Sequence, residues 1–414
     1  MFDSAEEKVR GKWLYVLVAV AAIAVGGWRT SFSIFLRPLM SYFGLEAVTP
    51  IATGFTLTSL AAVFSSPFLG TLYDRRGPGI VIYIGAITQL VSALLLYAVK
   101  FYPWSISMWL WYASSVVGGL GSPALIIAFN PSLVSLFPTR PDVALAIAQS
   151  SSYLSLTLWT PLLKVMMKSF DMFAPFLILP FISLSIIIAS GKIYSNLRLE
   201  RAETQKASRG ISGVSRPFIM TLIPIFLIAT SSTMLMQFLA PIIVDFCIAS
   251  GVDAEVASEV YVPLVMSVSG ILQSLGAFAW GFAAMQLSVF VALPLLYSLE
   301  TVTVLLALSL TRYGVYPVIT MLWLRFLAYG GEPVIHMLLI PTLFGRENIG
   351  KLLGVQTSTV MLASIVGPLI GGLARDFNGT YLTTALLAGI VSLAATIIAI
   401  TIITLLKREQ RQNR

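Results

Sequence analysis

The chain has 414 residues, of which 57% are hydrophobic and 11% are charged, whereas soluble domains carry roughly 25% charged residues. So few charged side chains are not enough for the surface of a water-soluble protein of this length. The composition therefore excludes a soluble fold and predicts an integral membrane protein. The net charge of +8 does not indicate nucleic-acid binding, because the basic residues lie in short segments between apolar runs. One cysteine, Cys247, excludes a disulfide framework and a cysteine-built metal site.

Twelve apolar stretches follow one another along the chain, each near or above the roughly 20 residues that cross a bilayer as a helix. They are residues 13–43, 49–74, 79–99, 104–133, 141–167, 173–195, 217–248, 256–285, 289–310, 316–344, 351–374 and 381–406. We expect the first to be a span and no cleaved signal peptide, because many more spans follow it. The predicted fold class is therefore all-α integral membrane, with twelve transmembrane helices.

The distribution of basic residues predicts the orientation. The segments on the side of the two termini hold 18 of the 26 Lys and Arg residues. Lys and Arg concentrate in cytoplasmic loops. We therefore expect a multi-pass protein of the cell membrane with both termini in the cytoplasm.

One long hydrophilic connection, residues 196–216, divides the spans into an N-terminal bundle of residues 1–195 and a C-terminal bundle of residues 217–414. Two sets of residues recur across this linker. Thr30, Phe35, Leu36 and Pro38 recur 203 positions later as Thr233, Phe238, Leu239 and Pro241; Leu110, Trp111, Gly118 and Gly119 recur 212 positions later as Leu322, Trp323, Gly330 and Gly331. The repeats predict two pseudo-symmetric six-helix bundles, an architecture that suits alternating access about a central site.

A short loop pattern follows the second span. Gly70, Asp74, Arg75 and Gly77 stand in the sequence Gly-Thr-Leu-Tyr-Asp-Arg-Arg-Gly, which resembles the signature loop of the major facilitator superfamily. The resemblance implies that these residues form a conformational latch on the inner side; the alternative is a solvated turn with positive-inside arginines. The basic residue that is usual two positions after the last glycine is replaced by Gly79.

Two further segments narrow the resemblance. Residues 29–44 resemble the first helix of the monocarboxylate transporter and oxalate/formate exchanger groups, and residues 367–381 resemble the end of their eleventh helix. The resemblance implies transport of a small organic anion, often with a proton, through a cavity lined by helices one, four, seven and ten. Two departures stand against it: residues 260–287 lack the acid and arginine of monocarboxylate transporters, and residues 352–374 lack the lysine of oxalate exchangers.

Ionisable residues at membrane depth are costly and tend to be functional or paired. Arg29 lies sixteen residues into the first span, and Glu300 lies within the ninth. The tenth span carries four polar side chains that fall within about 40° of one another at 100° per residue: Arg325, Tyr329, Glu332 and His336. We expect Arg29, Arg325, Tyr329 and Phe32 to bind substrate, and Glu332, His336 and Glu300 to carry a coupled proton.

Each of these assignments has a structural alternative. Arg29 is either an anion ligand or a structural cation bonded to backbone carbonyls. Arg325 and Glu300 are either functional or a buried ion pair between neighbouring helices. His336 is either a proton relay or a hydrogen-bonded packing residue, and the aromatic side chains are either a substrate wall or packing.

Three function classes compete at this stage. The leading one is a secondary active transporter that moves a small organic anion, a monocarboxylate, together with a proton. An organic anion exchanger and a drug or cation exporter are the alternatives, and a membrane sensor comes last. No nucleotide loop, metal-ligand cluster or nucleophile arrangement occurs in the sequence, so we expect no enzyme and no cofactor or metal. The expected partners are the anion, a proton and membrane lipid, with no nucleic acid, and we expect a monomer.

Overall fold

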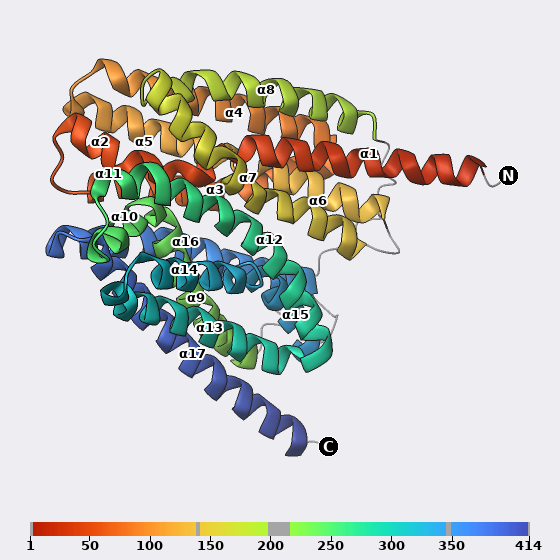
Figure 1. Cartoon of the computed structure of the whole chain (residues 1–414). Coiled ribbons are helices and arrows are strands. Elements are labelled where there is room, and N and C mark those ends of the chain that lie inside the picture. Colours follow the sequence, from red (N-terminus) through yellow and green to blue (C-terminus); the bar gives the residue numbers. More distant parts are fainter. Residues whose placement is uncertain (1–2, 138–140, 198–215, 345–348, 413–414) are drawn as a thin grey trace. The chain divides into compact units, whose positions relative to one another are not determined.

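The computed structural model describes residues 3–137, 141–197, 216–344 and 349–412 (Figure 1). The regular structure of these residues is entirely helical. Eleven of the described stretches are long and apolar enough to cross a membrane, and they coincide with eleven of the twelve predicted spans. The chain is therefore an all-α, multi-pass membrane protein, as the composition predicts.

The predicted fifth span, residues 141–167, forms the helix α7 (Pro141–Ser169). It has 29 residues, which exceeds the length of a span, but the polar run from Gln149 to Tyr153 lowers its hydropathy below that of the other eleven. Helices that are long enough to span but partly polar belong inside a bundle, where neighbouring helices satisfy the polar groups.

The chain forms two compact units, residues 1–32 with 57–208 and residues 33–56 with 209–414. The expected linker, residues 196–216, lies almost wholly outside the described residues. Segment 33–56 groups with the second unit, although the sequence repeats assign it to the N-terminal bundle. We describe each unit separately.

The first unit is built around α4, which packs against α5 and α8, while α1 packs against α7 and α8. Its helices are α1 (Asp3–Gly26), most of the 3-10 helix η1 (Gly27–Phe35), most of α3 (Thr49–Arg76), α4 (Pro78–Ala98), η2 (Val99–Phe101), α5 (Trp104–Gly121), α6 (Ala124–Leu136), α7 and α8 (Ala174–Ser195).

The second unit has α9 packed against α16 and α17, and α13 packed against α14 and α17. Its helices are α2 (Leu36–Phe43), the start of α3, α9 (Arg216–Gln237), α10 (Leu239–Ala249), α11 (Ala254–Val256), the π-helix η3 (Ala257–Tyr261), α12 (Val262–Leu287), α13 (Val289–Leu310), η4 (Thr311–Tyr313), α14 (Val315–Tyr329), α15 (Glu332–Phe344), α16 (Ile349–Asn378) and α17 (Tyr381–Gln412).

Four spans are interrupted in mid-course. The first changes to a 3-10 helix over residues 27–35, the fourth breaks at residues 122–123, the seventh at Phe238, and the tenth at Gly330 and Gly331. Irregular backbone at membrane depth is tolerated where it is buried in protein or lines a cavity, and broken helices mark binding sites in transporters. These are the four helices for which the resemblance implies a cavity-lining role.

The break in the tenth span coincides with a close approach of helices. A Cβ atom on Gly330 would lie 2.0 Å from the backbone oxygen of Gln273, and one on Gly331 would lie 2.4 Å from the ring of Trp280. The second pair of sequence repeats therefore includes glycines that let α14 and α15 pack directly on α12. The predicted polar stripe is thus carried by two helices joined by a tight turn, where the sequence spacing assumed one continuous helix.

Candidate functional site

Polar side chains of the first unit donate hydrogen bonds to backbone carbonyl groups near Arg29. Where α1 gives way to η1, the carbonyl of Gly26 accepts a hydrogen bond from the Gln89 side chain at 2.7 Å. The carbonyl of Ala24 accepts one from Trp159 Nε1 at 2.8 Å and one from Ser155 at 3.1 Å. A helix that changes its winding leaves carbonyls without intrahelical partners, and in a membrane other side chains must satisfy them.

Arg29 carries a positive charge without an acidic partner. Among the described residues it makes no ion pair and no hydrogen bond, and the centroid of the Trp28 ring lies 5.7 Å from Arg29 Cζ. The side chain is half-buried. Its guanidinium occupies the space left by Gly118, where a Cβ atom would lie 2.0 Å from Arg29 Nη1. The structural alternative, an arginine bonded to backbone carbonyls, is not what the geometry shows.

Phe32, the other predicted substrate ligand of the first unit, belongs to an aromatic cluster. Its ring stacks on Trp111 at 5.1 Å between centroids and on Phe176 at 5.9 Å. Only 5% of the residue is exposed. The ring therefore packs among aromatic side chains, and its contact with a substrate remains a prediction.

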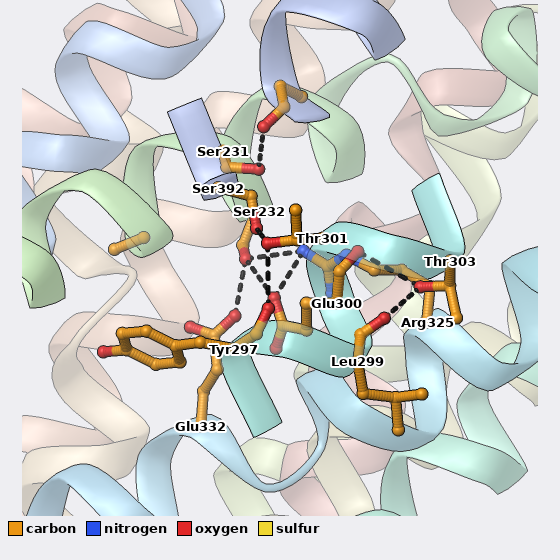
Figure 2. Close-up of polar contacts among 12 residues, drawn as sticks. Ser231, Ser232, Tyr297, Leu299, Glu300, Thr301, Thr303, Arg325, Glu332 and Ser392 are labelled. Atoms are coloured by element: carbon orange, nitrogen blue, oxygen red, sulfur yellow. Dashed lines mark hydrogen bonds and ion pairs between the residues drawn. The ribbon is translucent and has the colours of Figure 1, made fainter. Parts of the chain in front are cut away.

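The second unit contains a buried ion pair between adjacent helices. Arg325 Nη2 on α14 lies 2.9 Å from Glu300 Oε2 on α13, and the two side chains are 3% and 0% exposed (Figure 2). The sequence left open whether these two residues pair, and the structure confirms the pair. The ring of Tyr329 lies 5.5 Å from Arg325 Cζ and adds a cation–π contact.

Ser232 on α9 connects this ion pair to a second carboxyl group, that of Glu332 at the start of α15. Its hydroxyl accepts a hydrogen bond from Arg325 Nη2 at 2.8 Å and donates one to Glu332 Oε1 at 2.5 Å (Figure 2). The same hydroxyl is 3.4 Å from Glu300 Oε2, so it lies between the two carboxyl groups. We call Glu300, Arg325, Glu332 and Ser232 the acid cluster.

The acid cluster holds two carboxyl groups and one guanidinium, all at most 5% exposed. If both carboxyl groups are ionised, the cluster carries one net negative charge in a buried site, which is costly. It is neutral when one of the two carboxyl groups carries a proton. The space next to it, lined in part by Ser232, Arg325 and Tyr329, is about 10 Å³, near the lower limit for a single water molecule.

His336 does not bind the acid cluster directly. Its Nε2 lies 2.7 Å from the hydroxyl of Tyr297, and both side chains are buried. Tyr297 precedes Glu300 by one helical turn on α13. Further along that helix, the Thr301 hydroxyl pairs with those of Ser392 and Thr396 on α17, at 2.8 and 2.9 Å. The polar residues of α13 thus face α15 and α17, which accounts for their tolerance within the membrane.

Comparison with solved structures gives matches over nearly the whole chain. A bacterial homologue of the human lysosomal transporter Spinster, solved inward-facing and occupied, matches with a TM-score of 0.65 and 12% identity over 95% of this chain and 96% of the other. The same kind of homologue, solved inward-facing and unoccupied, matches with a TM-score of 0.65 and 13% identity over 97% and 98%. No protein-family model and no curated protein matches the sequence.

The chain has the major facilitator fold. The predicted fold class is thereby confirmed. At 12 and 13% identity the likeness concerns the fold alone, so the resemblance to monocarboxylate and oxalate/formate carriers stays a prediction.

The loop that resembles the superfamily signature is described in part. Gly77 adopts a φ of +83° between α3 and α4, which favours glycine, whereas Gly70 has open space around it and Arg75 is exposed. The side chain of Asp74 lies outside what the structure describes, so the latch remains a prediction. The missing basic residue has a steric reason: a Cβ atom on Gly79 would lie 1.8 Å from Ser195 Oγ, because α4 packs directly on α8.

Sequence analysis missed Ser232 and Tyr297. A serine in an apolar span is common and gives no signal by itself, but Ser232 lies 203 positions after Arg29, the offset of the first pair of repeats. That coincidence was the available sign that position 232 faces the same kind of site in the second unit as Arg29 does in the first. Tyr297 gave no comparable sign.

Proposed function

We propose that the chain is a secondary active transporter that moves a small organic anion, a monocarboxylate, together with a proton by alternating access. The fold, shared with transporters, and the four broken spans support transport. The proposal includes the cell membrane as location, cytoplasmic termini and an inner latch at Gly70, Asp74, Arg75 and Gly77. No enzymatic step is part of it.

The observation that carries the proposal is the acid cluster. It has one carboxyl group more than its arginine can neutralise, and both acids are buried in the same few ångströms around Ser232. A bound proton removes the excess charge. A buried carboxyl pair that gains and releases one proton is the chemistry that proton coupling requires.

Arg29 supplies the complementary charge. A guanidinium offers parallel N–H donors that match the two oxygens of a carboxylate, and such a charge-assisted pair is strong where water is scarce. Because Arg29 has no acidic partner within the described residues, one monoanion neutralises it. One anion at Arg29 and one proton on the acid cluster leave both sites without net charge, which favours symport of the two.

The proton site is tested in liposomes that contain purified protein. With labelled lactate as the probe, Glu332→Gln is expected to retain exchange between internal and external lactate and to lose uptake driven by an inward pH gradient. Glu255→Gln, at an exposed position, is the matched control and should behave as the wild type. Full pH-driven uptake by Glu332→Gln contradicts Glu332 as the proton-carrying residue. Glu300 then becomes the candidate, and Glu300→Gln tests it.

The anion site is tested by calorimetry on monodisperse protein. Arg29→Lys keeps the charge but loses the paired donors, so lactate should bind moderately more weakly, while Arg29→Gln should cost on the order of 3–5 kcal/mol. Arg312→Gln, at an exposed arginine, controls for the substitution itself. Wild-type affinity together with the wild-type number of bound lactates in folded Arg29→Gln removes this residue from the site and leaves Arg325 and Tyr329 as candidates.

A cation exporter is the second candidate, because the excess acid of the cluster also suits a cation that exchanges with protons. Thermal stabilisation by ligand separates the two classes. Lactate should raise the melting temperature under the leading proposal, whereas tetraphenylphosphonium should do so for an exporter. An anion exchanger would show lactate exchange in liposomes but no uptake driven by the pH gradient in the wild type.

A further inference from the structure

A second polar hollow lies in the second unit, at the end where α17 begins. Its volume is about 380 Å³, within the range of roughly 300–1,000 Å³ that is usual for small-molecule sites. All its lining residues belong to the second unit: Arg37, Met40, Leu45, Asp245, Arg375, Gly379 and Tyr381. We call it the outer pocket, since the predicted topology places it on the side opposite the termini.

The carboxylate groups in and beside the outer pocket already accept hydrogen bonds from the N-terminal ends of helices. Asp245 accepts hydrogen bonds from the backbone N–H of Tyr381 at 2.6 Å and from the Thr380 hydroxyl at 2.8 Å, at the first residue of α17. Asp376 accepts from the N–H groups of Val48 and Thr49 at 2.7 and 2.9 Å, at the start of α3. Both carboxylates therefore cap helix N-termini, where the partial positive charge of the helix stabilises them.

The two arginines keep donors that the aspartates do not use. Arg37 pairs with Asp245 through Nη2, and Arg375 contacts Asp376 and the carbonyl of Glu46 through Nη1. A guanidinium has five N–H donors. Within the described part of the chain, the Nε atoms of both arginines are buried and have no hydrogen-bond partner. In the same part of the chain, Arg37 Nη1 and Arg375 Nη2 make no hydrogen bond and are not buried, so an acceptor in the hollow can reach them.

The remaining walls suit a ligand with an apolar body. Met40 and Leu45 line the pocket, and the ring of Tyr381 lies 5.6 Å from Arg375 Cζ. Inorganic phosphate would leave these surfaces unused, whereas a short-chain carboxylate would bring its oxygens to the guanidinium groups and its carbon atoms to the apolar side chains.

We infer that the outer pocket is a binding site for a small organic carboxylate, held by Arg37 and Arg375 and separate from the site at Arg29. The inference that the pocket binds a carboxylate does not depend on the proposed transport. Only the role of the pocket as the first binding site of the transported anion rests on the proposed function. The spare guanidinium donors and the apolar wall carry the inference together.

The test is calorimetric titration of the full-length protein with lactate and, separately, with inorganic phosphate. Arg29→Gln isolates the outer pocket and should keep binding of one lactate per chain. Adding Arg375→Gln should weaken that binding at least ten-fold, and Arg312→Gln serves as the matched control.

A second variant leaves every charge in place. Leu45→Phe fills part of the hollow and should weaken lactate binding in the Arg29→Gln protein without a change in folding. Loss of all lactate binding in Arg29→Gln overturns the outer site while it supports the central one. Binding that survives Arg29→Gln but falls with Arg375→Gln supports the outer site. Two lactates per wild-type chain and one per Arg29→Gln chain keep Arg29 in the proposed function, whereas one in both removes it. Phosphate binding as tight as that of lactate and insensitive to Leu45→Phe overturns the assignment to an organic carboxylate.

Discussion

Arg325→Gln is expected to destabilise the protein more than the loss of both members of its ion pair does. Arg325 and Glu300 are 3% and 0% exposed and lie 2.9 Å apart. Removal of one partner from such a pair leaves a buried charge without compensation, which costs roughly 3–5 kcal/mol, whereas replacement of both is often close to neutral. The double variant Glu300→Gln with Arg325→Gln should therefore recover most of the stability that Arg325→Gln loses.

The measurement is a double-mutant cycle of unfolding free energy in mixed micelles, at a single pH near 7. Glu300→Gln alone leaves Arg325 with Glu332 and Ser232, so its loss should be the smaller of the two single variants. The interaction energy of the cycle should be well above the few tenths of a kcal/mol that distant sites show. Additive losses, with the double variant the least stable of all, would refute the view that the two charges compensate each other.

Three further predictions follow from single contacts. Gly118→Ala should fold but bind lactate weakly, because its Cβ would displace the flexible end of Arg29, as binding calorimetry can show. Gly330→Ala, at the repeat-related position, should instead lower the melting temperature, since its Cβ would meet the backbone of Gln273, and overpacking costs about 1–3 kcal/mol. The hydrogen bond from Lys100, at 2.6 Å, holds the pKa of Asp171 below its usual value. The wild type should thus be more stable than Asp171→Asn above about pH 4. This difference should vanish as the pH falls through the pKa of Asp171 in the folded protein, which a pH series of melting temperatures checks.

The fold class was predictable because its signal is summed over hundreds of residues. Twelve apolar runs and few charges are insensitive to the details of any one helix, and eleven of the runs match membrane-length helices. The repeats have a local counterpart in the structure. Phe35 and Phe238, related by the offset of 203, each directly precede the helix that resumes after a break, α2 and α10.

The candidate site was predictable only where charge made it visible. Arg325 and Glu300 stood out as ions at membrane depth, and their pairing was an open alternative that depends on the relative rotation of α13 and α14. The link through Ser232 and the pairing of His336 with Tyr297 require side chains from helices far apart in the sequence. Spacing along one helix cannot reveal such contacts, because it fixes which residues share a face but not which helix that face meets.

The repeat relation between Arg29 and Ser232 joins the two candidate sites into one argument. Both residues lie shortly before the matched phenylalanines, on the stretch where a span leaves regular helical winding or is about to break. In the first unit this position carries a cation that pairs with no acid among the residues that the structure describes; in the second it carries a hydroxyl that bonds an arginine and an acid at once. Since both units present this position at a mid-span break, the side chain placed there decides the chemistry. Under the proposed function, one half of the repeat then binds the anion while the other holds the proton.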